Sequence, residues 1–95
     1  MLDLSVIVPF YNMAKDGNLE YCIHSLARQT LQSMEIIAVD DASTDDSLKI
    51  LREFEKIYPG RVKAVASPEN RRQGGARNLG LREAQGRYIG FMDAD

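Results

Sequence analysis

The fold is decided by one stretch, Gly86-Arg87-Tyr88-Ile89-Gly90-Phe91-Met92-Asp93-Ala94-Asp95, in which an apolar run leads directly into two aspartates. A run of this kind, with a glycine before it and acids after it, is typical of a buried strand in a parallel sheet. Side chains two residues apart share one face of a strand, so Asp93 and Asp95 are expected to face one place together. Two adjacent carboxylates repel each other, and a hard divalent cation between them suits such oxygen ligands. The alternative interpretation is a polar strand end that enters a loop.

Strand-like and helix-like segments alternate along the chain that leads to this stretch. Strands are expected at residues 4–9, 35–39, 62–66 and 88–92, and helices at residues 19–27, 47–58 and 75–84. Pro9 is expected to end the first strand because it lacks a ladder donor, and Asn18 can cap the first helix. The order β-α-β-α-β-α-β predicts an α/β fold with a Rossmann-like parallel sheet and helices on both of its faces.

Polar side chains follow three of the expected strands. In an open parallel sheet, ligands bind at the carboxyl ends of the strands, where the strand order reverses. If the first three strands run outward in the order 3-2-1 and the fourth returns beside the first, the reversal lies between the first and the fourth. The loops of Tyr11 and of Asp93 and Asp95 then flank one crevice, and Asp41 lies one strand away.

The composition is that of an ordinary globular protein. The 95 residues fit one small domain or part of a larger one. A net charge of −2 gives no reason to expect a nucleic-acid partner. The single cysteine, Cys22, excludes an internal disulfide framework and is interpreted as an inert core thiol. No apolar run approaches the roughly 20 residues of a membrane helix and no signal peptide is evident, so we expect a cytoplasmic protein.

The loop after the first strand, residues 9–15, contains no glycine. Both common phosphate-binding loops need glycine there, so the phosphates of a nucleotide are not expected to be held by that backbone. A metal on the two terminal aspartates could hold them instead. Tyr11 offers a ring on which a base can stack, although it could also pack on the sheet end, and Asp41 could accept from a base N–H. Asp45 and Asp46 are interpreted as helix caps.

Five motifs stand in a fixed order along the chain: Val6-Ile7-Val8-Pro9-Phe10-Tyr11-Asn12, Ser25-Leu26-Ala27-Arg28-Gln29-Thr30, Glu35-Ile36-Ile37-Ala38-Val39-Asp40-Asp41-Ala42-Ser43-Thr44-Asp45, Gly75-Ala76-Arg77-Asn78-Leu79-Gly80 and the stretch quoted first. In this order and spacing they resemble the donor-binding half of a family 2 glycosyltransferase with the GT-A fold. The resemblance covers essentially the whole chain, which would form one donor-binding subdomain, residues 1–95, that ends at the Asp-x-Asp motif.

The resemblance implies roles for seven residues: Pro9, Tyr11 and Asn12 would line the base pocket, Asp41 would contact the base, Arg77 would border the nucleotide, Asp93 would lie near the ribose and the metal, and Asp95 would be the main metal ligand. The implied cofactor is Mn²⁺ or Mg²⁺. Whether Arg71, Arg72 or Arg77 meets the diphosphate stays open.

The implied reaction transfers a sugar from a nucleoside diphosphate sugar, expected to be a UDP-sugar, with inversion, to a saccharide or lipid-linked acceptor of cell-envelope polysaccharide. In the family the general base lies downstream of Asp95, so no catalytic residue is expected within this chain, which would bind donor without transferring sugar. The full-length protein is expected in the cytoplasm or at the inner face of the membrane.

Other functions stay in view. A non-catalytic nucleotide-binding module is the main alternative. The glycine-free loop disfavours an oxidoreductase-type dinucleotide domain, and a phosphoacceptor signalling domain would need acids after the first strand. The fourth strand is expected to present an unpaired apolar edge, through which the chain could self-associate into a homo-oligomer.

Overall fold

The computed structural model describes residues 2–15, 17–28, 33–69 and 72–92. In chain order the elements are β1 (Leu4–Phe10), α1 (Asn18–Ala27), β2 (Met34–Asp40), α2 (Ser47–Ile57), β3 (Val62–Ala66), α3 (Arg72–Glu83) and β4 (Tyr88–Phe91). Every element that the sequence predicts is present, and the predicted order is confirmed.

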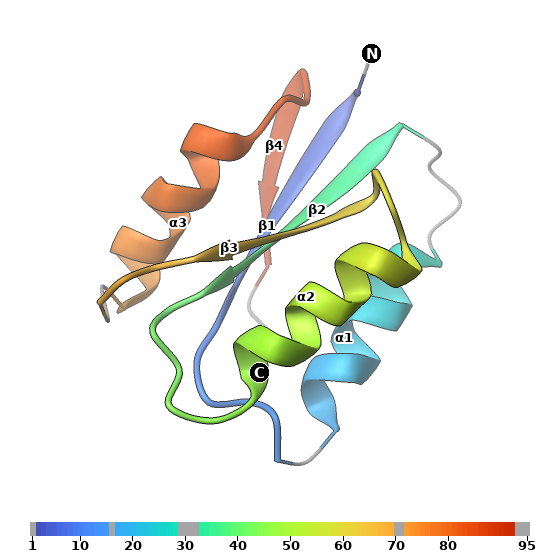
Figure 1. Cartoon of the computed structure of the whole chain (residues 1–95). Helices are drawn as coiled ribbons and strands as arrows, with labels where there is room; N and C mark the ends of the chain where they lie inside the picture. Colours follow the sequence, from blue (N-terminus) through green and yellow to red (C-terminus); the bar gives the residue numbers. More distant parts are fainter. Residues whose placement is uncertain (1, 16, 29–32, 70–71, 93–95) are drawn as a thin grey trace.

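The four strands form one parallel sheet in the order β3-β2-β1-β4. β1 therefore lies between β2 and β4, and the strand order reverses between β1 and β4, as predicted (Figure 1). All four strands run the same way, so their carboxyl ends lie along one edge of the sheet. The loops that follow β1 and β2 leave the sheet at this edge.

Helices cover both faces of the sheet, with α1 and α2 on one face and α3 on the other (Figure 1). The two faces use alternate side chains of β1 and β2, because successive side chains of a strand point to opposite sides. Val6, Val8 and Ile36 pack with α1 and α2, whereas Ile7 and Ile37 pack toward α3. This two-sided burial explains why β2 reads as a continuous apolar run.

The structure corrects the predicted end of β1, which continues through Pro9 to Phe10. The backbone N–H of Met92 donates to the oxygen of Ile7, so the polar groups of Ile7 face β4. Residues two apart in a strand face the same side, so Pro9 also faces β4. The paired register of β4 ends where Phe91 meets Ile7, so the proline removes no ladder donor from the described sheet.

Two helix starts also differ from the prediction. α1 begins with Asn18 itself, and the N-cap position belongs to Gly17, with φ 74° and no side-chain cap. Glycine adopts this left-handed conformation without steric cost, whereas a capping asparagine usually has β-region backbone. α3 begins at Arg72 rather than at residue 75, so the last residues of the polar segment that was expected to be a loop belong to the helix.

β4 is exposed in the described part of the chain, as the expected unpaired edge requires, whereas the burial predicted from its apolar run alone is wrong there. β4 forms one edge of the sheet, and Tyr88 and Phe91 are 65% and 48% exposed. An edge strand carries backbone groups that pair with nothing on its outer side. The described part of the chain therefore leaves the apolar side chains of β4 exposed.

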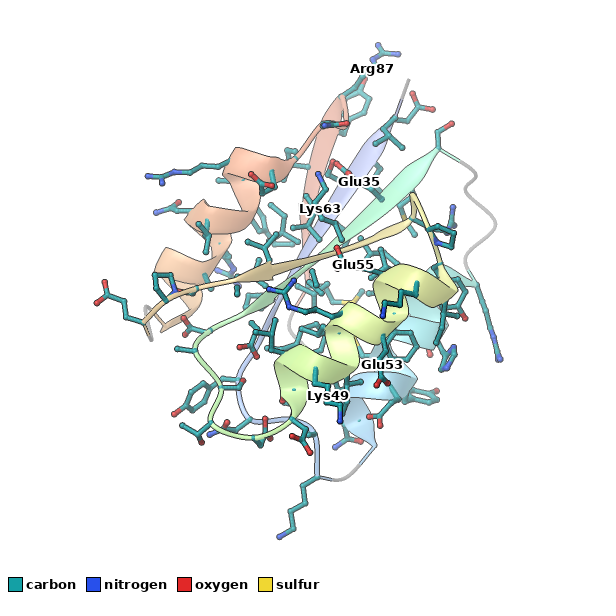
Figure 2. The ribbon with its side chains drawn as sticks, viewed as in Figure 1. Glu35, Lys49, Glu53, Glu55, Lys63 and Arg87 are labelled. Atoms are coloured by element: carbon teal, nitrogen blue, oxygen red, sulfur yellow. The ribbon has the colours of Figure 1, made fainter. Side chains whose placement is uncertain are left out.

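A buried carboxylate joins three segments at the amino-terminal end of the sheet. Glu35 is 4% exposed and accepts hydrogen bonds from Ser5 Oγ (2.6 Å) and from the backbone N–H of Gln85 (2.7 Å). The Ser5 hydroxyl in turn accepts from the N–H of Gly86 (2.8 Å). Glu35 and Arg87 lie toward the same end of the sheet (Figure 2). Both bonds to Glu35 end on its Oε2, and together with the Ser5 bond they hold the α3–β4 connection against β1 and β2.

This close approach predicts a large difference between two glycine substitutions. A Cβ at Gly86 would lie 2.6 Å from the backbone nitrogen of Ser5, whereas a Cβ at Gly90 would meet only Leu4 Cδ1, at 3.8 Å. Gly86→Ala should lower the free energy of unfolding by about 1–3 kcal/mol through overpacking, and Gly90→Ala should change it little. Urea unfolding of the two variants measures the difference, and equal losses would contradict the packing described.

Candidate functional site

The loops that follow β1 and β2 lie side by side at the carboxyl edge of the sheet. The backbone N–H of Asp41 donates to the oxygen of Phe10 at 2.9 Å, so parallel pairing continues to the last residues of both strands. Tyr11 follows Phe10 directly. The structure therefore brings the Tyr11 loop next to the Asp41 loop, as the predicted topology requires.

The Asn12 side chain links the two loops. Its Oδ1 accepts hydrogen bonds from the backbone N–H of Thr44 (2.8 Å) and of Asp45 (3.3 Å). The backbone N–H of Asn12 donates to Ser43 Oγ at 2.9 Å. The sequence placed Asn12 among residues that line a base pocket, but this connecting role was missed. The sequence signal for this role is the residue type: asparagine tolerates a left-handed backbone, and its short side chain forms hydrogen bonds with nearby backbone amides.

Further bonds run between the same loops beyond Asn12. The N–H of Met13 donates to Ser47 Oγ (2.9 Å), and the N–H of Ala14 donates to Asp45 Oδ2 (3.1 Å). Asp45 also accepts from the N–H of Ser47 at 2.9 Å, which agrees with its predicted capping role. Asp46 occupies the N-cap position of α2 without a side-chain cap. Of the two predicted caps, only Asp45 therefore acts as one.

Both loops contain backbone that L-residues rarely adopt. Among the described residues other than glycine, a positive φ occurs at Asn12 (51°) and Ala42 (59°). Alanine has no side chain that compensates for this conformation, so Ala42 is held by its surroundings. Such outliers gather at ligand sites, where the fold over-determines the local geometry. Their position in these two loops marks this edge as the candidate site.

The predicted base-contact residues differ in accessibility. Tyr11 is 47% exposed, so its ring is open to a stacking partner rather than packed on the sheet end. Asp41 is only 4% exposed, and Pro9 is half-buried inside β1. A ligand would therefore meet Tyr11 first, whereas Asp41 is recessed.

Arg77 lies on the other side of β1, next to β4. Its guanidinium carbon stands 5.5 Å from the ring centroid of Phe91, at the carboxyl end of β4. Arg77 is half-buried on α3, which covers the opposite face of the sheet from α1 and α2. The structure thus places a cation near the strand-order reversal.

Asp93 and Asp95, the predicted metal ligands, lie outside the described residues, as does Arg71. Within the described ranges, no three His, Cys, Asp or Glu side chains converge in a way that could hold a metal ion. The described residues therefore do not form a metal site by themselves, and the metal stays a prediction.

The loop after β2 carries a high density of negative charge. Asp40, Asp41, Asp45 and Asp46 fall within seven residues, 40–46. Asp40 is buried and accepts from the N–H of Ser43 at 3.1 Å, a role that the sequence analysis missed. Such a loop repels a diphosphate but suits the N–H groups of a base.

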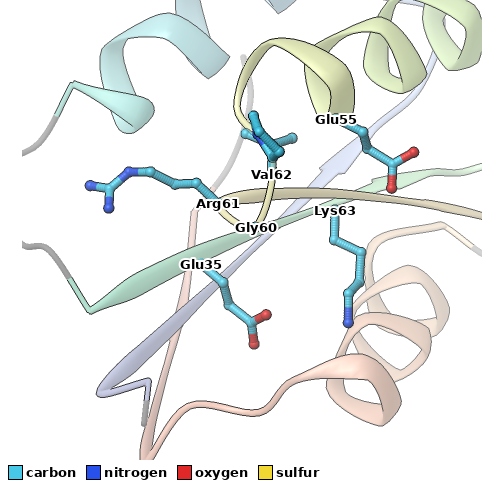
Figure 3. A pocket seen from close by; sticks show the side chains of 7 residues that line it. Glu35, Glu55, Gly60, Arg61, Val62 and Lys63 are labelled. Carbon is cyan, nitrogen blue, oxygen red and sulfur yellow. The ribbon is translucent and has the colours of Figure 1, made fainter.

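A cleft of about 290 Å³ lies at the opposite end of the sheet, where β2 and β3 begin. Glu35 and Lys63 project from one side of these strands, and Glu55 lies on the other side of β3, where α2 packs (Figure 3). Glu35 is already bonded to Ser5 and Gln85, and Glu55 accepts from the N–H of Ala64 at 3.0 Å. These carboxylates are structural, and the cleft is not part of the candidate site.

Comparison with known proteins agrees with this geometry. The family described as Glycosyl transferase family 2 matches residues 5–95. The chain belongs to this family. Among its relatives, TuaG of Bacillus subtilis strain 168, whose name places it in teichuronic acid biosynthesis, is 45% identical over 92 residues, which are 97% of this chain and 35% of TuaG.

Two solved structures are similar to this chain over nearly its whole length. S. aureus TarS 1–349 in complex with UDP-GlcNAc has a TM-score of 0.84 and 32% identity over 99% of this chain and 27% of that one. The mannosyltransferase PcManGT from Pyrobaculum calidifontis, in complex with GDP-Man and Mn²⁺, has a TM-score of 0.86 and 30% identity over 97% of this chain and 27% of that one. The chain thus spans about a third or less of the proteins it matches. None of the helices in the described ranges is long and apolar enough to cross a membrane.

The bonds at Asp45 predict an acid-sensitive loop. Partial desolvation raises the pKa of Asp45, but hydrogen bonds from Ser47 and from the N–H of Ala14 outweigh it and leave the pKa below its ordinary value. The stabilisation is therefore complete above the unfolded-state pKa of about 3.9 and is lost as the pH falls through the lower folded value.

An NMR titration of the Ala14 and Ser47 amides below about pH 4 should show their shifts moving with the Asp45 carboxyl. Asp45→Asn should abolish this movement, whereas Asp46→Asn, which removes the same charge from a neighbouring residue without a side-chain cap, should preserve it. Identical titrations in the two variants would contradict the bonding described.

Proposed function

We propose that this chain is the donor-binding part of a metal-dependent glycosyltransferase that uses a nucleoside diphosphate sugar. The observation that carries the proposal is the pair of loops after β1 and β2, joined at the carboxyl edge of the sheet beside the strand-order reversal, in a fold similar to that of TarS bound to UDP-GlcNAc. The donor we propose is a UDP-sugar, and the acceptor is a saccharide or lipid-linked component of a cell-envelope polysaccharide.

The nucleoside end of the donor would bind at the β1 and β2 loops. Tyr11 offers an open ring on which any base can stack, because every base has a π face. Asp41, beside it, offers a carboxylate acceptor for a base N–H. Pro9 would complete the pocket, and Asn12 would contribute to it by joining the two loops that carry Tyr11 and Asp41. The acidic residues of the loop after β2 repel the phosphates and accept from the N–H groups of the base. The donor would therefore lie with its base at this loop and its phosphates pointing away from it.

The diphosphate would then extend toward β4. Arg77 lies beside Phe91 at that end, so its positive charge would be near the diphosphate. We propose Asp95 as the main ligand of Mn²⁺ or Mg²⁺, with Asp93 near the ribose and the metal. When bound, such a cation would neutralise the charge of the diphosphate leaving group.

The transfer we propose is inverting, with a general base that removes the proton of the acceptor hydroxyl. The family resemblance places that base outside residues 1–95, so this chain would bind donor without turning it over. We place the complete enzyme in the cytoplasm or peripherally at the inner membrane face.

Calorimetry with UDP tests donor binding directly. We expect binding that needs Mn²⁺ and that weakens at least about tenfold in Asp95→Asn, because one charged metal ligand is lost. Asp46→Asn is the matched control, since it removes the same charge from an exposed loop residue. Equal affinity with and without metal, or in wild type and Asp95→Asn, would contradict the proposed metal site. Sugar transfer by the longer protein would then distinguish an enzyme from a nucleotide-binding module.

We also propose that the outer edge of β4 pairs with a second copy of the chain. Exposed apolar residues gather at this edge: Tyr88, Ile89, Phe91 and Met92. Sedimentation should show a concentration-dependent dimer that Ile89→Lys weakens, because a charged edge residue opposes strand pairing. A monomer at every concentration reached would refute the pairing.

A further inference from the structure

We propose that Asn12 and Asp45 form an inter-loop clamp that sets the position of Tyr11 relative to Asp41 and thereby the base selectivity of the donor pocket. Both are positioning residues, since they would act through the loops rather than by touching the base. The inference rests on the proposed nucleotide site and assigns to Asn12 a role different from pocket lining.

The clamp is reciprocal. Three consecutive backbone N–H groups, those of Asn12, Met13 and Ala14, donate to side chains of the second loop and of the first residue of α2. In return, the N–H groups of Thr44 and Asp45 donate to the Asn12 side chain. Each loop thus uses its side chains to satisfy the backbone of the other, and neither loop can shift along the sheet edge without breaking several bonds at once.

The place of these bonds shows why they matter beyond stability. The strand ends are already joined by the bond between Asp41 N–H and the oxygen of Phe10, and Phe10 itself is buried. The bonds of Asn12 to Ser43, Thr44 and Asp45 are exposed. Exposed hydrogen bonds add little to global stability. What they fix is the course of the chain immediately after Tyr11, where Asn12 adopts φ 51°.

Selectivity should depend on this fixed course. Stacking on Tyr11 accepts any base, so the ring alone does not discriminate. A recessed carboxylate at Asp41 can discriminate, because uracil offers an N3–H donor where cytosine has only an acceptor. The contact forms only if a base stacked on Tyr11 lies at the right distance from Asp41. The bond between Asp41 N–H and Phe10 holds the chain just before Tyr11 and the clamp holds it just after, so both together maintain that distance.

Two variants of Asn12 separate the clamp from other effects. Asn12→Gly keeps the left-handed backbone accessible and removes the side-chain acceptor. Asn12→Asp keeps an acceptor oxygen and also tolerates positive φ, while it removes the amide donor. Asn18→Gly is the matched control: it makes the same substitution at the exposed first residue of α1, which takes no part in the inter-loop bonds.

Two measurements are made on the 95-residue chain. Amide hydrogen exchange in the absence of ligand should accelerate at Thr44 and Asp45 in Asn12→Gly, and should stay near wild type in Asn12→Asp and Asn18→Gly. Calorimetry with UDP and CDP in the presence of Mn²⁺ should show that Asn12→Gly weakens UDP binding about tenfold and narrows the preference for UDP over CDP by a similar factor. Asn12→Asp adds a negative charge that weakens UDP and CDP alike, because both carry the same diphosphate, but it should restore the preference for UDP over CDP.

Different results overturn different claims. If Asn12→Asp loses the preference for UDP over CDP as Asn12→Gly does, while exchange at Thr44 and Asp45 stays near wild type, the acceptor oxygen does not set the selectivity, and the positioning role is wrong. If exchange and selectivity in Asn12→Gly match wild type, the clamp does not exist in solution. If wild type itself binds no nucleotide with metal, the proposed function fails, and the clamp's role in base selectivity fails with it; a failed clamp alone would leave wild-type binding intact.

Discussion

Parallel pairing of β1 with β2 on one side and with β4 on the other is the constraint on which the rest of the molecule depends. The register aligns Phe10 with Asp40 and Ile7 with Phe91, so the ends of three strands are placed along one edge. Because β1 occupies the centre, both of its faces are buried and its side chains anchor both helix layers. The loop that follows it is therefore fixed at its start by the core and at its middle by the Asn12 bonds.

The arrangement of charge along this edge follows from the same topology. Carboxylates gather after β2, whereas Arg77 lies beside β4. A donor nucleotide laid across the reversal would meet an open aromatic ring and acceptors at one end and a cation at the other. Membership of glycosyl transferase family 2 and the likeness to TarS with UDP-GlcNAc fit this polarity.

The sequence predicts the large features because hydrophobic periodicity reports burial directly. The run Ile36-Ile37-Ala38-Val39 is fully buried, and Ala76 and Gly80 form the small-residue face of α3 against the sheet. The strand order also follows from alternation and handedness. Two local details differ from the prediction. Pro9 stays in its strand, since the described register of β4 reaches only Phe91, a residue distant in the chain. Gly17 takes the cap position expected of Asn18. The Asn12 bonds were not predictable, since they join loops more than 30 residues apart. The predicted metal ligands lie outside the described residues, so no comparison is possible there.

Mapping of UDP by NMR, in the presence of diamagnetic Mg²⁺, tests the central claim most directly. If the donor nucleotide binds at the carboxyl edge, amide shift changes should concentrate in residues 9–14 and 41–45 and extend to Arg77. The cleft lined by Glu35, Glu55 and Lys63 lies at the other end of the sheet and serves as an internal reference. Changes that centre on that cleft, with the two loops unaffected, would contradict the account.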